Sequence, residues 1–317
     1  DSIIRISVSG TPVIDPAVAI SQSSIVAVLN MYDTLVVPDG ETVKGLLAES
    51  WDVNEEGTEF TFHLKQGVPF HNGDEVKASD VVFSTKRLLT IGEGYAYLFN
   101  NTIQDVAAVD DYTVKFTLQA PYGPFLSTLP RLYILNEKQV MEHISEGAYG
   151  EFGDYGKDWL ITNDAGSGPY MAQELVQQSH FTATQFPDWH VGWQPNAPTG
   201  FKMIDNTEAT TIRTMMANRE LEITDMWQST ENLTTISKLP GVKIAAYSPM
   251  TVQNLYFNTK KAPTDDVNYR KALSCLLDYD MFIENVFIGS SRAYGPVSCY
   301  TAGYEETSHY DYDIEKA

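Results

Sequence analysis

The chain has 317 residues, of which 43% are hydrophobic and 12% are aromatic, so it can bury two cores and is too apolar to be disordered. Its 42 acidic residues against 21 Lys and Arg give a net charge of -21, which argues against binding to nucleic acid or to anionic lipid. No apolar run of about 18 residues is present. The two cysteines, Cys275 and Cys299, exclude a disulfide framework and a four-cysteine zinc site, but one bridge between them stays possible.

Hydrophobic periodicity predicts a strand, a loop and a helix at the start of the chain. Apolar and polar residues alternate over Ile3–Ser9, which is typical of a strand with one buried face. The segment Gly10–Pro16 is rich in turn residues and is expected to be a loop. A helix is predicted over Ser24–Val37, and Pro38–Gly40 is expected to form a turn.

A β-rich block comes next. Strict period-two alternation over 59–65 and again over 113–119 predicts two half-buried antiparallel strands. Their inward residues would be Phe60, Phe62, Leu64, Val114, Phe116 and Leu118. Between these strands, Val81 and Leu88 lie seven residues apart, which predicts one face of a helix within 78–89. Pro121 and Pro124 precede a short helix at Phe125–Leu129.

The second half of the chain begins with two further strands, at Tyr170–Leu175 and His180–Phe186. Strands then alternate with helices, which predicts a sheet with parallel pairs and covering helices. These elements are strands at 201–204, 221–223 and 242–247 and helices at 207–218 and 230–239. A strand at 254–259 follows, then an amphipathic helix with Tyr269, Ala272, Leu273, Leu276 and Leu277 on one face, then a helix at 280–288 ended by Gly289.

Catalytic motifs give little support for an enzyme. The glycine-rich segment Gly166–Tyr170 contains Pro169, which has no backbone donor, and no lysine of a phosphate loop follows it. The same segment fails the G-x-S-x-G motif, because Ala165 and Pro169 occupy the glycine positions. We therefore expect these residues to form a turn.

The segment around His71 is the strongest alternative for a chemical site. A metal-dependent hydrolase using His71 and Asp74 would need a third ligand, but the six histidines are scattered and form no H-E-x-x-H motif. Turns use Asn, Gly and Asp for their own backbone hydrogen bonds, which explains Asn72, Gly73 and Asp74 without a metal. His63 is expected on the outer face of its strand. We predict no catalytic residue, no metal site and no cofactor.

One long stretch resembles a known family. The segment Leu47–Ser84 is similar to the signature of extracellular solute-binding proteins family 5, the dipeptide-, oligopeptide- and nickel-binding components of ABC importers. The matching residues are Leu47, Ala48, Ser50, Trp51, Gly57, Phe62, Leu64, Gly67, Val68, Phe70, Asn72, Gly73, Asp80, Val81 and Ser84. The blocks at 121–126, 166–170 and 255–278 and the final "YDIEKA" extend the resemblance over nearly the whole chain. Lys77 replaces a usual capping Thr, so Ser79 is expected to cap the following helix.

The resemblance implies a periplasmic-binding-protein-like (type II) α/β fold with two lobes around a cleft. The first lobe would comprise 1–44 and 168–250, with an inserted β-rich subdomain at 45–167, and the second lobe would begin at 258–317. Family members are longer, so we expect the chain to be C-terminally truncated. The implied function is the substrate-binding component of an ABC importer, which captures a peptide-like solute and delivers it to a membrane permease. The implied protein is monomeric, extracellular or periplasmic, and tethered as a lipoprotein.

Six residues are candidates for contacting the ligand. The loop after the first strand and the residue after the 221–223 strand lie at strand carboxyl ends, where α/β proteins usually bind ligands. Two further residues occupy segments that face the cleft in relatives. The candidates are Gly10, Thr11, Pro12, Trp227, Tyr97 and Arg131. Aromatic residues and one Arg suit a pocket for a carboxylate and apolar side chains, whereas core positions for Trp227 and Tyr97 and a surface position for Arg131 are the plain alternatives. The ligand could be a peptide, a nickel chelate, a sugar or an opine-like compound. The hinge between the two lobes is expected at 247–258.

Overall fold

The computed structural model describes residues 2–245, 252–287, 289–301, 303–307 and 309–317. The chain divides into two compact units, Asp1–Gln228 and Ser229–Ala317. The domain bounds expected from the sequence stay a prediction. None of the helices among the described residues is long and apolar enough to cross a membrane.

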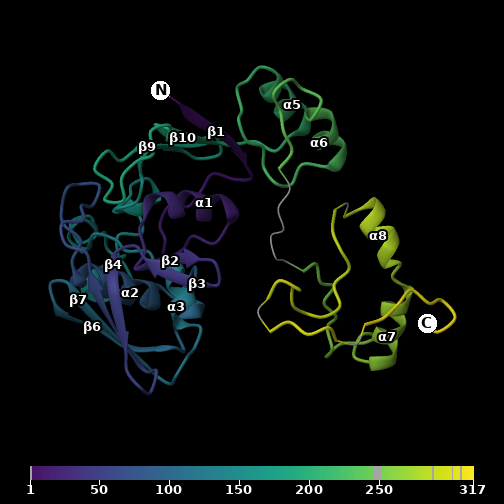
Figure 1. The fold of residues 1–317 in the computed structure, drawn as a ribbon, viewed down its shortest axis with the longest axis horizontal. Coiled ribbons are helices and arrows are strands. Elements are labelled where there is room, and N and C mark those ends of the chain that lie inside the picture. The colour runs from purple at the N-terminus through teal and green to yellow at the C-terminus, as the bar shows by residue number, and fades with distance from the viewer. Residues whose placement is uncertain (1, 246–251, 288, 302, 308) are drawn as a thin grey trace. The chain divides into compact units, whose positions relative to one another are not determined.

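The first unit contains a four-stranded mixed sheet with the order β1-β10-β9-β8. Its strands are β1 (Ile3–Val8), β8 (Tyr170–Val176), β9 (His180–Gln185) and β10 (Gly200–Asp205). Only β1 and β10 are parallel, with Ile3 opposite Gly200, and the other pairs are antiparallel. Helix α1 (Gln22–Met31) packs against β8, and α5 (Ala209–Ala217) follows β10 (Figure 1).

The expected alternation of strands and helices is realised only in part. The 221–223 segment makes a single parallel bridge, Ile6 to Ile223, in place of a full strand. Residues 242–245 and 254–259 form no strand, so these two predictions are wrong; residues 246–251 lie outside the described residues. Apolar runs become strands only when another strand offers its backbone groups, and no strand among the described residues pairs with these segments.

The predicted helix at 24–37 is too long at its carboxyl end. Helix α1 starts after Ser21, whose side chain accepts a hydrogen bond from the Ser24 N–H, and it ends at Met31. Tyr32 is extended, and Thr34 forms an antiparallel bridge with Tyr133. The chain then enters β2 (Val36–Asp39), which pairs with β3 (Thr42–Gly45). Pairing with distant backbone has overridden the local helical pattern.

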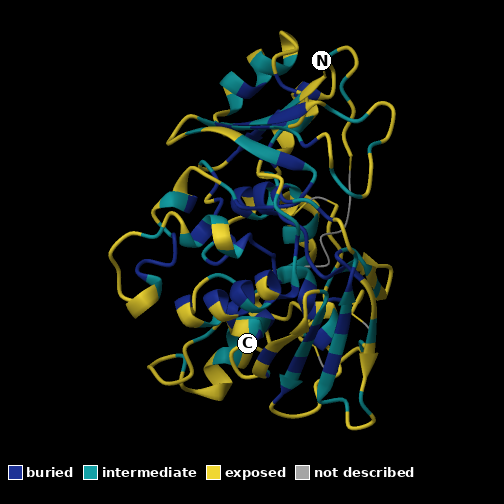
Figure 2. Ribbon diagram, turned by 90° about the vertical axis from the view of Figure 1, so that its left-hand side faces the viewer, coloured by how far each residue is buried: buried dark blue, intermediate teal, exposed yellow. Residues whose placement is uncertain are grey.

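A second sheet in this unit is fully antiparallel and has the order β4-β5-β7-β6. Its strands are β4 (Ala48–Val53), β5 (Glu59–Leu64), β6 (Ile103–Asp110) and β7 (Thr113–Leu118). The six inward residues predicted from alternation are all buried, and Figure 2 shows the alternation as blue and teal bands along the strands. The rings of Phe60, Phe62, Phe116 and Phe125 contact one another in pairs at 4.7–5.7 Å between centroids, so this face is an aromatic core.

Helix α2 (Ala78–Ile91) covers this sheet and packs on β6 and β7. Val81 and Leu88 are buried as predicted. Lys77, not Ser79, occupies the N-cap position, and the carboxylate of Asp80 accepts the Lys77 N–H at 2.8 Å. The shorter elements are α3 (Phe125–Thr128), α4 (Glu137–Met141) and the 3-10 turns η1 (Ala96–Leu98), η2 (Leu129–Arg131), η3 (Gly150–Phe152) and η4 (Trp159–Ile161).

The described residues of the second unit include the helices α6 (Thr230–Ile236), α7 (Val267–Leu276) and α8 (Tyr279–Asn285), joined by turns and irregular segments. The helix predicted around Tyr269–Leu277 is present, but Tyr269 and Leu276 are exposed, so the expected apolar face is only partly covered. Helix α8 ends at Asn285, short of the predicted 288, which lies outside the described residues. Cys275 is buried, Cys299 is exposed, and both are free thiols.

Candidate functional site

The structure brings the loop after β1 to the edge of the first sheet, where the parallel strands end. The backbone N–H of Gly10 donates at 2.8 Å to Oδ1 of Asp205, the last residue of β10. The hydroxyl of Thr11 donates to Gln177 Oε1 at 3.1 Å, in the turn between β8 and β9. Gly10 is exposed and Thr11 is half-buried, but Pro12 is buried. Gly10 and Thr11 are therefore accessible to solvent, whereas Pro12 is not.

Trp227 lies beside the same strand edge. Asp225 binds the Ser7 hydroxyl through its backbone N–H at 2.7 Å, which fastens this segment to β1. The Asp225 carboxylate then accepts a hydrogen bond from the backbone N–H of Trp227 at 2.9 Å. The indole of Trp227 is left 70% exposed, so it is not a core aromatic. The backbone hydrogen bonds fix the position of Trp227 while its large ring stays in solvent. Such a ring can stack on a bound molecule.

Arg131 and Tyr97 belong to a second group, which Tyr95 joins. The guanidinium of Arg131, at the end of η2, lies 4.9 Å from the centre of the Tyr95 ring. The Tyr95 and Tyr97 rings are 6.1 Å apart, and Tyr97 is 64% exposed. Burial raises the pKa of the neighbouring Tyr133, and the nearby Arg131 guanidinium opposes that shift. This group offers a cation and aromatic faces at the protein surface.

Sequence reasoning missed Tyr95 and also the residues that connect the two groups. The turn after Pro12 runs through Asp15 to Ala17, and Ala17 contacts the backbone of Gly94, directly before Tyr95. Tyr95 follows two glycines in "GEGY", a loop pattern that could have marked the whole segment as a surface loop. The contact with Arg131 has no local signal, because it spans segments far apart in the sequence.

The alternative site at His71 and Asp74 does not form. His71 Nδ1 lies 2.5 Å from Asp164 Oδ1, and Nε2 donates to the Gly168 carbonyl at 2.9 Å. Asp74 instead accepts hydrogen bonds from the amides of Asn72 and Asn136, which lower its pKa. The two side chains bind different partners and do not converge on one site, so the structure does not support the hydrolase hypothesis.

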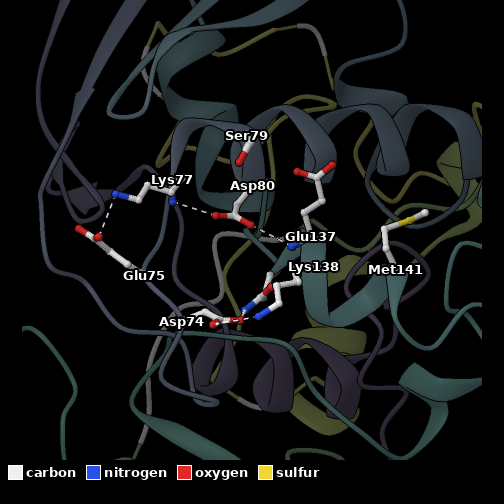
Figure 3. A pocket seen from close by; sticks show the side chains of 9 residues that line it. Asp74, Glu75, Lys77, Ser79, Asp80, Glu137, Lys138 and Met141 are labelled. Carbon is white, nitrogen blue, oxygen red and sulfur yellow. Dashed lines mark hydrogen bonds and ion pairs between the residues drawn. The ribbon is translucent and has the colours of Figure 1, made fainter.

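A surface pocket near Asp74 is lined by Asp74, Glu75, Lys77, Ser79, Asp80, Asn136, Glu137, Lys138 and Met141 (Figure 3). Three of its four carboxylates, those of Asp74, Glu75 and Asp80, already accept hydrogen bonds. Lys77 and the Gly67 N–H lower the pKa of Glu75 to about 2. Burial raises the pKa of Asp80 to about 6, although it accepts the N–H groups of Lys77 and Glu137. Within the described part of the chain, no group of three potential metal ligands occurs. These contacts join the ends of α2 and α4, which is a structural role.

Comparison with known proteins gives consistent results. The sequence profile described as "Bacterial extracellular solute-binding proteins, family 5 Middle" matches residues 42–317. The "Probable D,D-dipeptide-binding periplasmic protein DdpA" of Escherichia coli (strain K12) is 31% identical, with 96% of this chain and 58% of that protein covered. The "Dipeptide-binding protein" of the same organism is 28% identical, with 90% of this chain and 56% of that protein covered. The chain thus spans little more than half the length of these relatives.

Solved structures agree on the fold. The periplasmic binding protein DppA from Helicobacter pylori, in complex with the peptide STSA, matches with a TM-score of 0.84 and 25% identity, over 99% of this chain and 64% of that chain. NikZ from Campylobacter jejuni, in complex with Ni(L-His), matches with a TM-score of 0.84 at 19% identity, over 99% of this chain and 61% of that chain. The type II periplasmic-binding-protein fold predicted from the sequence is confirmed.

Proposed function

Because the chain belongs to the family 5 bacterial extracellular solute-binding proteins, we propose that it is the capture part of an ABC importer. In this function it binds a peptide-like solute and presents it to a membrane permease. The curated relatives named above are peptide-binding periplasmic proteins by their descriptions, which supports a peptide as the first ligand to test. The proposal includes no chemical reaction and no cofactor.

One observation carries the choice of ligand chemistry. Arg5, Arg87 and Arg292 each form an ion pair with a carboxylate of the chain, whereas Arg131, Arg213, Arg219 and Arg270 form none with any carboxylate of the described residues. Arg213 and Arg270 donate to backbone carbonyls, but the guanidinium of Arg131 lies over the Tyr95 ring, in a protein of net charge -21. A guanidinium with free donors binds carboxylates through paired hydrogen bonds. We therefore assign Arg131 to a ligand carboxylate, with Tyr97 and Trp227 contacting apolar parts of the solute.

The mechanism we propose is capture by closure of two lobes in the whole protein. A ligand that contacts both lobes has higher affinity for the closed state and shifts the equilibrium towards it. The chain would pass between lobes at 247–258, of which 247–251 lie outside the described residues. The closed form would then be recognised by the permease.

The cellular setting belongs to the same proposal. We propose a monomer outside the cytoplasmic membrane, in the periplasm or at the cell surface, tethered there as a lipoprotein and working with permease subunits. Nucleic acid is not a partner in this proposal, because the chain has twice as many acidic as basic residues.

The test uses the full-length protein, with thermal shift followed by calorimetry. The probes are D-Ala-D-Ala, L-Ala-L-Ala, Met-Leu, Ser-Thr-Ser-Ala and nickel-histidine. We expect at least one peptide to raise the midpoint of unfolding. Arg131→Gln should weaken that peptide at least tenfold and should leave the affinity for its C-terminally amidated form unchanged. Lys115→Gln, which removes the exposed ion pair with Glu59, is the matched control and should bind as wild type. Binding of nickel-histidine alone would replace the peptide assignment.

A further inference from the structure

A buried ion pair joins the loop after β1 to helix α2. Arg87 is fully buried, and its Nη1 and Nη2 donate to the two oxygens of Asp15 at 2.7 and 2.6 Å. The third donor, Nε, is used by the Tyr155 carbonyl at 2.8 Å. Asp15 is 2% exposed. The pair therefore fixes three separate segments of the chain at one point.

Asp15 also shapes its own loop. Its Oδ1 accepts the Ala17 N–H at 2.9 Å, and its carbonyl accepts the N–H groups of Val18 and Ala19 at 3.2 and 3.0 Å. The turn that results begins three residues after Pro12. The other end of the loop is fastened by the bond from Gly10 to Asp205. Asp15 thus anchors the chain that follows the Gly10–Pro12 segment, together with the Val13 N–H, which donates to Ser24 Oγ at 2.9 Å.

The same turn supports the tyrosine loop. A Cβ atom placed on Gly94 would lie 2.7 Å from the carbonyl oxygen of Ala17, so the two backbones are in direct contact. Gly94 has a φ of +53°, and Lys157 binds the carboxylate of the preceding Glu93 at 2.9 Å. Tyr95 comes directly after this contact, so its position beneath Arg131 depends on where the Asp15 turn lies.

We propose that Asp15 and Arg87 are positioning residues for ligand binding, which set the spacing between the Gly10–Pro12 loop and the Tyr95–Tyr97 loop. The inference rests on the proposed function. A buried ion pair contributes little net stability relative to an apolar pair of similar size, because desolvation opposes the attraction. Its paired N–H···O geometry does impose one arrangement on the segments it joins. Both candidate ligand segments are attached to this one arrangement.

The experiment compares three variants of the full-length protein. Arg87→Lys keeps the positive charge but loses the paired donors. Asp15→Asn/Arg87→Gln removes both charges and keeps polar side chains, so it remains usable if the first variant does not fold. His71→Gln breaks another buried pair, with Asp164, and is the matched control. Amide hydrogen exchange is measured without ligand, and affinity is measured with the peptide probes named above.

We expect faster exchange over 13–19 and 94–98 and at least tenfold weaker peptide binding in the Asp15 and Arg87 variants. The control should lose stability but keep both the exchange of these loops and the affinity. Unchanged exchange at 94–98 would overturn the proposed spacing role. Changed exchange with wild-type affinity would make the pair merely structural. If the wild type binds none of the probes, the proposed function fails, while exchange still decides whether the pair holds the two loops.

Discussion

His71 connects its own turn to the distant segment 164–168 through both nitrogens of its ring. Nδ1 lies 2.5 Å from Asp164 Oδ1, and Nε2 donates to the Gly168 carbonyl at 2.9 Å. Asp164 also accepts the Ala172 N–H at 2.6 Å, at the start of β8. The pair is 7% and 6% exposed, so it is a buried connection between the antiparallel sheet region and the first sheet.

His71→Gln should therefore lower the free energy of unfolding by about 2 kcal/mol, because buried polar groups of Asp164 and Gly168 lose their hydrogen-bond geometry. Urea unfolding followed by circular dichroism measures this. His63→Gln is the control, since His63 is 43% exposed and bonds to the exposed Asp52. The control should change the free energy by less than about 1 kcal/mol. Equal losses in the two variants would contradict the role of the buried pair.

Asp80 should make part of the stability depend on pH. Burial raises its pKa from 3.8 to about 6 in the folded chain. Between these values the folded state binds the proton more readily than the unfolded state, so this group adds stability as the pH falls from 7 towards 4. The gain between pH 7 and pH 5 is about 1 kcal/mol. Glu75, with its pKa lowered to about 2, acts in the opposite direction and loses its contribution at low pH.

Asp80→Asn separates these effects, because Asn does not titrate. The wild type should gain about 1 kcal/mol relative to this variant when the pH changes from 7 to 5. Urea unfolding at both pH values measures the difference, and Asp52→Asn, at an exposed position, should show no such change. If the free energy of unfolding of the wild type instead fell relative to that of Asp80→Asn from pH 7 to pH 5, the pKa of Asp80 would not be raised by burial.

The parts of the fold that were predictable depend on local patterns. Strict alternation predicted β5 and β7, since Phe62 and Phe116 are forced inward by the pleat of their own strands. The helical spacing of Val81 and Leu88 predicted α2 in the same way. The strands expected over 242–245 and 254–259 do not form, because pairing requires a distant partner. Local patterns report which face is apolar, but not which segment covers it.

The residues of the candidate site were likewise predictable only where a local sequence pattern marks them. Gly10 and Trp227 were predictable from their positions after strands, and the exposure of the indole removes the alternative of a core aromatic. The ion pair of Asp15 and Arg87 spans 72 residues and had one usable signal. Arg87 lies three residues after Ser84 and four before Ile91, on a face of α2 that is buried. A charged residue on such a face requires a buried partner, but the sequence does not identify it.

The Gly166 position should tolerate no side chain. A Cβ atom there would lie 1.9 Å from the Met31 carbonyl oxygen, at the end of α1. Gly166→Ala should lower the free energy of unfolding by roughly 3 kcal/mol, because backbone must move to remove the overlap. Gly123→Ala is the matched control, since no atom lies within 4 Å of its Cβ position. The control should be neutral or stabilising by up to about 1 kcal/mol. An equally large loss in Gly123→Ala would show that the loss in Gly166→Ala does not come from the overlap with the Met31 carbonyl.

The two cysteines should react at very different rates with a thiol reagent. Cys299 is exposed and Cys275 is 3% exposed, and reaction requires access of the reagent to the sulfur. Titration of the native chain with Ellman's reagent should give one fast equivalent, and titration in denaturant should give two. Cys299→Ser should abolish the fast equivalent and leave one in denaturant. A chain that releases no thiol in denaturant without reductant would instead contain a disulfide between the two residues, and two fast equivalents in the native chain would mean that Cys275 is accessible.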